Sequence, residues 1–66
     1  MKRRLISSAI EAVDYDPETG HMKLWFPQNG PYSFYRVPEQ VYLGLINAYS
    51  KGSYYNNHIR GRYSLP

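Results

Sequence analysis

The acidic and imidazole side chains are the first candidates for chemistry in this chain. Asp14 and Asp16 flank Tyr15 at the spacing of alternate strand residues, so both carboxylates could face one side as an acid–base pair or as ligands for a hard metal ion. We favour a structural interpretation, because Asp16 begins a turn sequence and Asp14 would be a solvated strand residue. His21 and His58 lie in distant segments, and no further ligand at a recognisable spacing completes a zinc site. We therefore predict no metal site, and an enzyme would need Asp14, Asp16 and His58 to converge.

The serine and glycine patterns typical of enzymes are missing from the sequence. Ser7 and Ser8 would need an adjacent, oriented base to act as nucleophiles, and there is no nucleophile elbow and no glycine-rich phosphate loop. We expect their hydroxyls to bond backbone groups at the start of a strand. We predict that the chain is not an enzyme, and no cofactor is indicated.

The C-terminal segment is the first candidate binding surface, because it mixes aromatic, amide and cationic side chains without a carboxylate. Arginine binds phosphate through its planar fork, aromatic rings stack on unpaired bases, and asparagine bonds base edges. The basic residues Lys2, Arg3 and Arg4 would add electrostatic attraction from the other end of the chain. Alternatively, Asn56 and Arg60 tie the last helix to the sheet. The candidate nucleic-acid or nucleotide ligands are Lys51, Tyr54, Asn56, Asn57, His58, Arg60, Arg62 and Tyr63.

A second candidate surface comes from the unusual aromatic content, which is eight tyrosines, two phenylalanines and one tryptophan in 66 residues. Tyrosine either fills a small core or supplies rigid contact area at an interface. Trp25 and Tyr35 are expected on the sheet face that the helices leave uncovered, where they would suit a protein partner. The aromatic residues that we assign to the core are Tyr32, Phe34, Tyr42 and Tyr55.

Turn chemistry divides the first half of the chain into strands. Residues 16–20 begin with an aspartate, continue with a proline and end in a glycine, which favours an Asx turn closed by a left-handed residue. Residues 27–31 contain Asn29 and Gly30, which favour a type I′ connection. Between these turns Met22 and Leu24 alternate with polar residues, as on a strand with one apolar face. We predict a three-stranded antiparallel β-meander, with a bulge or bend at residues 11–12.

Helical periodicity follows the predicted sheet. Pro38 suits a first helical turn, and apolar residues at helical spacing over 41–49 can pack on one sheet face. Gly52 is expected to end this helix, and Ser53 to cap a short second helix over residues 54–60. The predicted fold is therefore α+β, with the meander followed by an α-helix and a short second helix on one sheet face.

Length and composition allow a single domain over residues 1–66. A chain of this size buries little more than about 60% of its unfolded surface, so its stability is expected to be marginal. The absence of cysteine excludes disulfides and thiolate zinc sites, and leaves a homodimer open as a means of stabilisation. We expect the basic residues 1–4 to be flexible and residues 64–66 to be frayed.

The charge and hydropathy patterns bear on location. The net charge is +3, and all five carboxylates lie between Glu11 and Glu39, so both ends of the chain are basic. No apolar stretch approaches the ~20 residues that cross a bilayer. The basic N-terminus is followed too soon by Glu11 to be an export signal. We therefore expect a cytoplasmic protein that does not enter a membrane.

Three segments, at residues 6–16, 32–38 and 48–60, together resemble the KTSC domain family. The first contains serine–serine–x–isoleucine before tyrosine–aspartate, and the last contains serine–x–glycine–x–tyrosine–x–asparagine. The family is named for a C-terminal extension of a lysyl-tRNA synthetase, and it also occurs as small stand-alone proteins of bacteria and bacteriophages. It has no established biochemical activity, and its tie to a tRNA synthetase implies proximity to RNA only by analogy.

Two functions follow as hypotheses. The first is a small non-catalytic module that binds RNA, DNA or a nucleotide through the basic, tyrosine-rich C-terminal segment. The alternative is a protein-interaction module, in which a phage protein would act on a host component through Trp25 and Tyr35 on the exposed sheet face.

Overall fold

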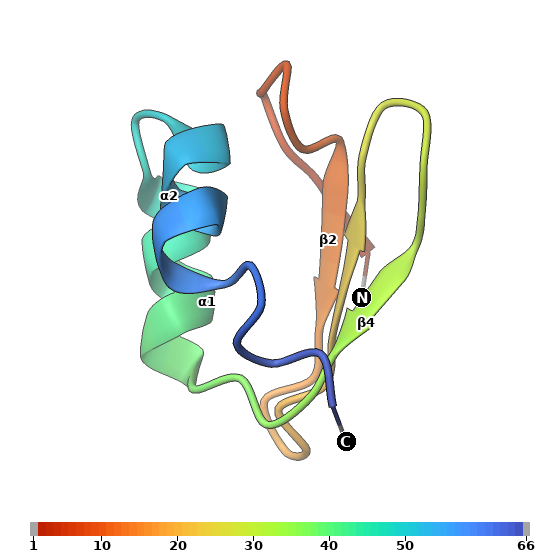
Figure 1. The fold of residues 1–66 in the computed structure, drawn as a ribbon, viewed down its shortest axis with the longest axis vertical. Helices are drawn as coiled ribbons and strands as arrows, with labels where there is room; N and C mark the ends of the chain where they lie inside the picture. The colour runs from red at the N-terminus through yellow and green to blue at the C-terminus, as the bar shows by residue number, and fades with distance from the viewer. Residues whose placement is uncertain (1, 66) are drawn as a thin grey trace.

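The computed structural model describes residues 2–65 and shows an antiparallel sheet with two helices on one of its faces (Figure 1). The strands are hydrogen-bonded in chain order, β1-β2-β3-β4. The α+β class and the antiparallel meander followed by two helices are therefore confirmed, with one more strand than predicted. The elements are β1 (Lys2–Arg4), β2 (Ala12–Tyr15), β3 (Met22–Trp25), β4 (Tyr32–Phe34), α1 (Glu39–Asn47) and α2 (Lys51–His58).

The additional strand, β1, lies where the sequence indicated a flexible basic end. Lys2 pairs with Asp14 and Arg4 pairs with Ala12, which makes β1 an edge strand of the sheet. All three of its residues are exposed, so their charges stay in water while the backbone pairs on one side. At the other end, Ser64 and Leu65 lie in no helix or strand, and the expectations for residues 1 and 66 fall outside the described residues.

The first predicted hairpin turn is confirmed. Asp16 Oδ1 accepts a hydrogen bond from the Glu18 N–H at 2.9 Å, and the Asp16 carbonyl accepts one from the Gly20 N–H at 2.8 Å. Gly20 has a φ of 78°, the left-handed conformation that glycine adopts without steric cost.

The second hairpin turn differs from the predicted type I′ connection. Phe26 and Asn29 exchange backbone hydrogen bonds, at 2.8 Å and 3.2 Å, so Pro27 and Gln28 form the tip instead of Asn29 and Gly30. Proline favours the first central position of a turn because its ring fixes φ near −65°. That preference places the turn nearer the strand end than the asparagine–glycine pair suggested.

The predicted irregularity at residues 11–12 is confirmed as a β-bulge. The Glu11 N–H donates to the Trp25 carbonyl at 2.7 Å, although the ladder pairs Trp25 with Ala12. In the loop before it, Ser7 Oγ accepts hydrogen bonds from the backbone N–H groups of the residues two and three positions later, at 3.0 Å and 3.3 Å. The predicted bonding of the Ser7 hydroxyl to backbone groups is therefore confirmed, although it occurs in a loop and not at the start of a strand.

The boundary between the helices was predicted incorrectly. α1 ends at Asn47, and the cap of α2 is Ser50, whose side chain accepts a hydrogen bond from the Ser53 N–H at 3.3 Å. Ser50 and Ser53 are both suitable N-caps, and because Ser50 is the one used, the second helix begins earlier than expected. Gly52 consequently lies inside α2, where a Cβ would approach the Cβ of Ala9 to 2.9 Å.

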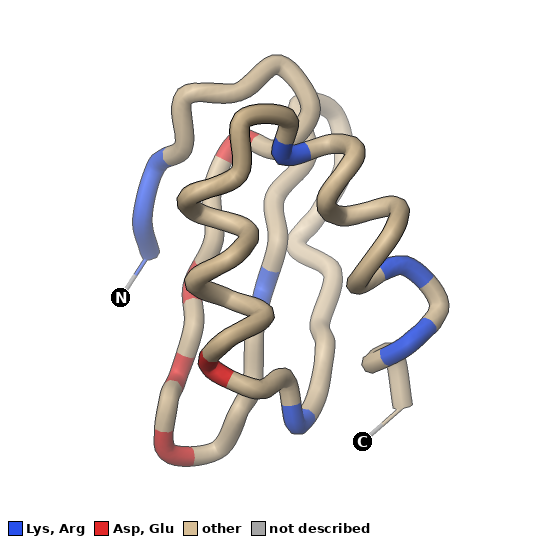
Figure 2. Tube along the Cα trace, turned by 90° about the vertical axis from the view of Figure 1, so that its left-hand side faces the viewer, with Lys and Arg blue, Asp and Glu red and all other residues tan. Residues whose placement is uncertain are grey.

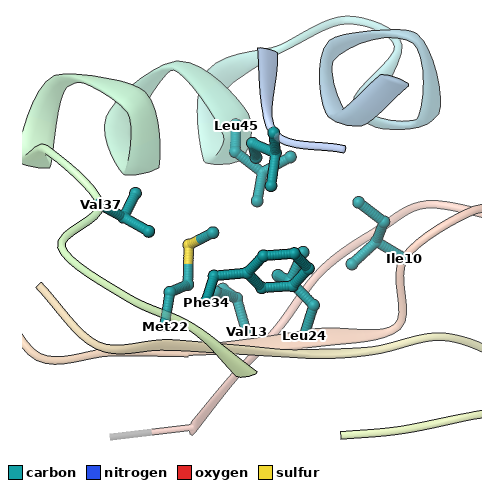
Figure 3. Close-up of a cluster of buried hydrophobic side chains, with 8 residues drawn as sticks. Ile10, Val13, Met22, Leu24, Phe34, Val37 and Leu45 are labelled. Atoms are coloured by element: carbon teal, nitrogen blue, oxygen red, sulfur yellow. The ribbon is translucent and has the colours of Figure 1, made fainter. Parts of the chain in front are cut away.

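The core lies between the sheet and the helices (Figure 3). The predicted alternation in β3 is confirmed, since Met22 and Leu24 are both fully buried. Tyr42 and Tyr55 pack against the core as predicted, whereas Tyr32 is 48% exposed. The buried apolar side chains that form the cluster are Ile10, Val13, Met22, Leu24, Phe34, Val37, Leu45 and Ile59.

Within residues 2–65 no helix has both the length and the apolar character needed to span a bilayer.

Candidate functional site

A row of aromatic rings runs from the sheet edge to α2. The ring centroids of Tyr32 and Phe26 lie 5.5 Å apart, those of Phe26 and Tyr55 lie 5.2 Å apart, and those of Tyr55 and Phe34 lie 6.1 Å apart. Beside these rings is a groove with a volume of about 250 Å³. We call it the aromatic groove, and its lining residues are Tyr32, Ser33, Phe34, Tyr55, Gly61 and Ser64.

Three segments far apart in the sequence build this groove. Tyr32 and Phe34 both lie on the helix-facing side of β4, because every second strand residue shares a face, and Tyr55 comes from α2. The segment after α2 returns to the sheet, where the Tyr35 N–H donates to the Tyr63 carbonyl at 2.7 Å (Figure 1). This bond fixes the third wall of the groove against the end of β4.

Two exposed arginines adjoin the groove. Arg60 and Arg62 flank Gly61, which has a φ of 75° and lines the groove. Among residues 2–65 the Arg60 guanidinium donates one long hydrogen bond, 3.5 Å to Asn56 Oδ1, and this bond stays within the segment. Figure 2 shows the two basic positions beside the C-terminus, with the acidic positions on the other side of the view. This end of the groove is therefore a place where an anion is favoured.

Three of the predicted ligand residues serve the fold. Lys51 Nζ donates to the Ala48 carbonyl at 3.0 Å, just after α1. Tyr54 lies across Gly44, where a Cβ would overlap its ring, and Tyr63 is half-buried against the core. The three side chains are half-buried and contact the protein itself.

The remaining predicted ligands are exposed. Asn56, Asn57 and His58 lie on the last turns of α2 with their side chains accessible to solvent. The His58 ring lies 4.4 Å from the Tyr54 ring, between centroids. Together with Arg60 and Arg62, these three residues are the predicted ligands whose side chains are exposed to solvent.

The outer sheet face, opposite the helices, carries the second predicted surface. Trp25 shares this face with Arg4 and Ala12 through the strand register, and Lys2 Nζ lies 4.5 Å from the centre of its ring. Tyr35 stacks on His21 with their centroids 5.2 Å apart and their planes at 5°. Both predicted aromatic residues are thus half-buried by side chains of the same face.

The structure does not bring the possible catalytic residues together. Asp14 pairs with Lys2 and Lys23 across the strands and so lies on the outer sheet face, whereas His58 belongs to α2 on the inner one. Asp16 is used in the first hairpin turn. Among residues 2–65 no group of three histidine or acidic side chains is placed to hold a metal ion.

Tyr15, between the two aspartates, has a structural role. Its hydroxyl donates to the Val37 carbonyl at 2.6 Å, and its ring stacks on Tyr42 with a centroid distance of 4.5 Å. Burial raises the pKa of Tyr15 above its ordinary value, and the neighbouring charges of Glu39 and Asp16 raise it further. The neutral phenol therefore joins β2 to the segment leading into α1.

The groove residues Tyr32, Ser33 and Ser64 were not among the ligands predicted from the sequence. Tyr32 shares its strand parity with the core residue Phe34, and that parity led to its assignment to the core. No spacing rule connects Ser33 with Ser64, because they meet only when the chain returns to β4. The one available signal was the aromatic content of the central segment.

Comparisons with known proteins give a consistent result. The family model of the KTSC domain matches residues 6–63. A crystal structure of a KTSC domain protein from Yersinia pestis superposes with a TM-score of 0.90 and 28% sequence identity, covering 96% of this chain and 89% of that chain.

Three curated proteins are similar in sequence. A protein of Tsukamurella paurometabola is 39% identical, over 86% of this chain and 85% of its own length. A lysine–tRNA ligase of Nostoc sp. is 38% identical over 85% of this chain, and one of Nostoc punctiforme is 32% identical over 88% of it. In both ligases the matching segment is 10% of the protein's length.

Proposed function

The chain belongs to the KTSC domain family, and from this premise we propose that it is a non-catalytic module that binds single-stranded nucleic acid. The observation that carries the proposal is the aromatic groove with Arg60 and Arg62 on either side of its Gly61 wall. The groove would hold a base and the guanidinium groups would bind the flanking phosphates.

The size and chemistry of the groove support a base as the occupant. Its volume of about 250 Å³ lies below the roughly 300–1,000 Å³ that is typical of sites for whole drug-sized ligands. Tyr32 presents a half-exposed ring there, and stacking of a base on an aromatic ring contributes about 1–3 kcal/mol. An unpaired base can reach such a ring, whereas a base inside a duplex cannot.

The charge distribution supports a polyanion. The sequence contains no aspartate or glutamate after Glu39, so the whole segment that carries Arg60 and Arg62 is free of acidic side chains. Arginine binds phosphate with two parallel hydrogen bonds from its planar fork. Affinity should consequently fall with salt, because each neutralised phosphate releases counterions.

The relatives support RNA in particular. Two of them are lysine–tRNA ligases, whose name states that they act on a transfer RNA, and a similar segment forms a small part of each. A domain of this kind inside such an enzyme would lie near RNA. For this chain we extend that association to single-stranded RNA as the preferred ligand.

A fluorescence-anisotropy titration with labelled single-stranded RNA and DNA oligomers tests the proposal. We expect saturable binding at low salt that weakens as salt is added. The double variant Arg60→Ala/Arg62→Ala should bind about tenfold more weakly or worse, because hydrogen bonds to charged groups contribute about 1.5–3 kcal/mol each.

The matched control is Arg4→Ala/Lys23→Ala, which removes the same charge from the outer sheet face. It should weaken binding only slightly. An absence of saturable binding at low salt, or an equal loss in both double variants, would contradict the proposal.

A second candidate function is a protein-interaction module. In its favour, the helices cover only one face of the sheet, so the face that carries Trp25 and Tyr35 is open to a partner (Figure 1). A partner would need to displace Lys2 from the Trp25 ring. Capture of the same bacterial protein by the wild type and by Arg60→Ala/Arg62→Ala, together with its loss in Trp25→Ala, would favour this function.

A further inference from the structure

The free edge of β4 borders the aromatic groove. β4 pairs with β3 on one side, and within residues 2–65 no strand pairs with its other side. On that free side the Tyr35 N–H donates to the Tyr63 carbonyl. Backbone groups of successive strand residues point alternately to the two sides, so the N–H and carbonyl of Ser33 point to the same free side as the N–H of Tyr35.

The backbone of Ser33, more than its side chain, faces the groove. The register pairs Ser33 with Lys23, whose side chain lies on the outer sheet face with that of Trp25. The rings of Tyr32 and Tyr55 line the groove from the opposite, helix-facing side. Ser33 lines the groove as well, so its backbone N–H and carbonyl, which bond to no residue within 2–65, lie along the groove's sheet edge.

Only one residue of this edge offers both groups. Going towards the start of β4, the next residue that points outward is Pro31, which has no N–H. Going the other way, the N–H of Tyr35 is already bonded to Tyr63. An added peptide strand needs several successive backbone pairs, so this edge is too short for strand addition. One adjacent donor and acceptor instead match the edge of a single base.

We infer that Ser33 binds an unpaired base through its backbone, with its N–H donating to the base and its carbonyl accepting from it, while the aromatic rings of the groove contact the base face. The inference rests on the proposed function and specifies the ligand of that site. Adenine, cytosine, guanine and uracil each carry an adjacent donor and acceptor on the edge that pairs in a duplex. Ser33 should therefore favour unpaired over paired bases and discriminate little among the four.

The test compares a single-stranded RNA pentamer of adenosine with the same backbone lacking its bases. The variant Ser33→Pro removes the outward N–H together with the side-chain hydroxyl, and an edge strand tolerates proline where the N–H points outward. Ser33→Ala, which keeps the N–H, is the control. We expect the wild type and Ser33→Ala to prefer the base-bearing pentamer. Ser33→Pro should lose about fivefold of that preference, the effect of one lost hydrogen bond. Its affinity for the abasic strand should be unchanged.

A measurement on the wild type alone guards against misfolding of the proline variant. In ¹H–¹⁵N spectra, the Ser33 amide resonance should move downfield on addition of the adenosine pentamer and stay unchanged with the abasic strand. An unmoved Ser33 amide, or a Ser33→Pro variant that keeps the full preference, overturns the inference. Equal binding of both strands by the wild type overturns the inference and the base-binding part of the proposed function, and leaves the phosphate-binding part standing. No binding of either strand overturns both.

Discussion

Tyr54 of α2 lies directly over Gly44 of α1, and a Cβ at position 44 would overlap the tyrosine ring. The two helices contact each other through this pair among others. A glycine in the middle of a helix weakens that helix. Here the missing side chain of Gly44 leaves room for the large ring of Tyr54. The arrangement explains why Tyr54 is turned towards the protein and away from solvent.

Gly44→Ala should destabilise the protein, although alanine is the better helix former by about 1 kcal/mol. We expect a net loss of up to about 2 kcal/mol, because inserting an atom into a packed site costs about 1–3 kcal/mol and the better helix propensity offsets about 1 kcal/mol of it. Denaturant unfolding followed by circular dichroism measures it. In a Tyr54→Leu background the same substitution should cost less, and a stabilising Gly44→Ala would show that helix propensity outweighs the contact.

Gly20→Ala and Gly61→Ala form a matched pair with positive φ values of 78° and 75°. A Cβ at Gly20 would lie 2.9 Å from Arg36 Cα and 3.0 Å from Val37 N, whereas nothing lies within 4 Å at Gly61. Both substitutions carry the cost of a left-handed alanine, about 1–2 kcal/mol. Only Gly20→Ala adds a backbone clash, so the thermal-unfolding midpoint of this variant should be clearly lower than that of Gly61→Ala. Equal midpoints for the two variants would contradict this explanation.

Tyr15 should make stability depend on alkaline pH. Its pKa is raised in the folded state, first by burial and then by Glu39, so the neutral phenol is favoured by folding. Its contribution is complete below the unfolded pKa of about 10 and is lost as the pH rises through the higher folded value.

Tyr15→Phe should therefore flatten the fall in unfolding free energy above about pH 10, after an initial loss of about 0.5–1.5 kcal/mol for the hydrogen bond to Val37. Urea unfolding at a series of pH values provides the comparison. Tyr49→Phe is the control, because Tyr49 is fully exposed, and it should retain the wild-type profile. A Tyr15→Phe profile parallel to that of the wild type would refute the assignment.

Tyr32→Ala should weaken binding of single-stranded RNA by about 1–3 kcal/mol, the amount that one base–ring stack contributes. Because its side chain is 48% exposed, the accompanying loss of stability should be small. Anisotropy measures the affinity and thermal unfolding measures the stability. The control is Tyr49→Ala, because Tyr49 lines a different crevice together with Ile6 and Lys51. This variant should bind single-stranded RNA with the affinity of the wild type.

The parts of the fold that were predicted correctly have local causes. The alternation of Met22 and Leu24 and the turn beginning at Asp16 depend on residues within a few positions of one another. β1 was missed because its three residues are all exposed and carry no apolar face. The start of α2 was misplaced because Ser50 and Ser53 are both capable caps, and the choice between them depends on how α2 packs against Ala9.

The candidate site was only partly predictable for the same reason. Arg60 and Arg62 were identified from composition, since they lie in a segment without carboxylates. The groove itself requires β4, α2 and the returning C-terminal segment to meet. The bond from Tyr35 to Tyr63, which brings them together, joins backbone atoms and therefore has no signature in side-chain types.

The two edges of the sheet differ in how they discourage a second molecule from extending it. A neighbour that paired with β1 would bring its own Lys2–Arg4 strand, or another strand of the sheet, against three like charges held in water. At β4, Pro31 and the bond to Tyr63 leave too little backbone for a lasting ladder. A sheet this small, with strands only three or four residues long, is thereby protected against fibril-like extension at both edges. Electrostatic repulsion protects one edge, and missing or occupied hydrogen-bonding groups protect the other.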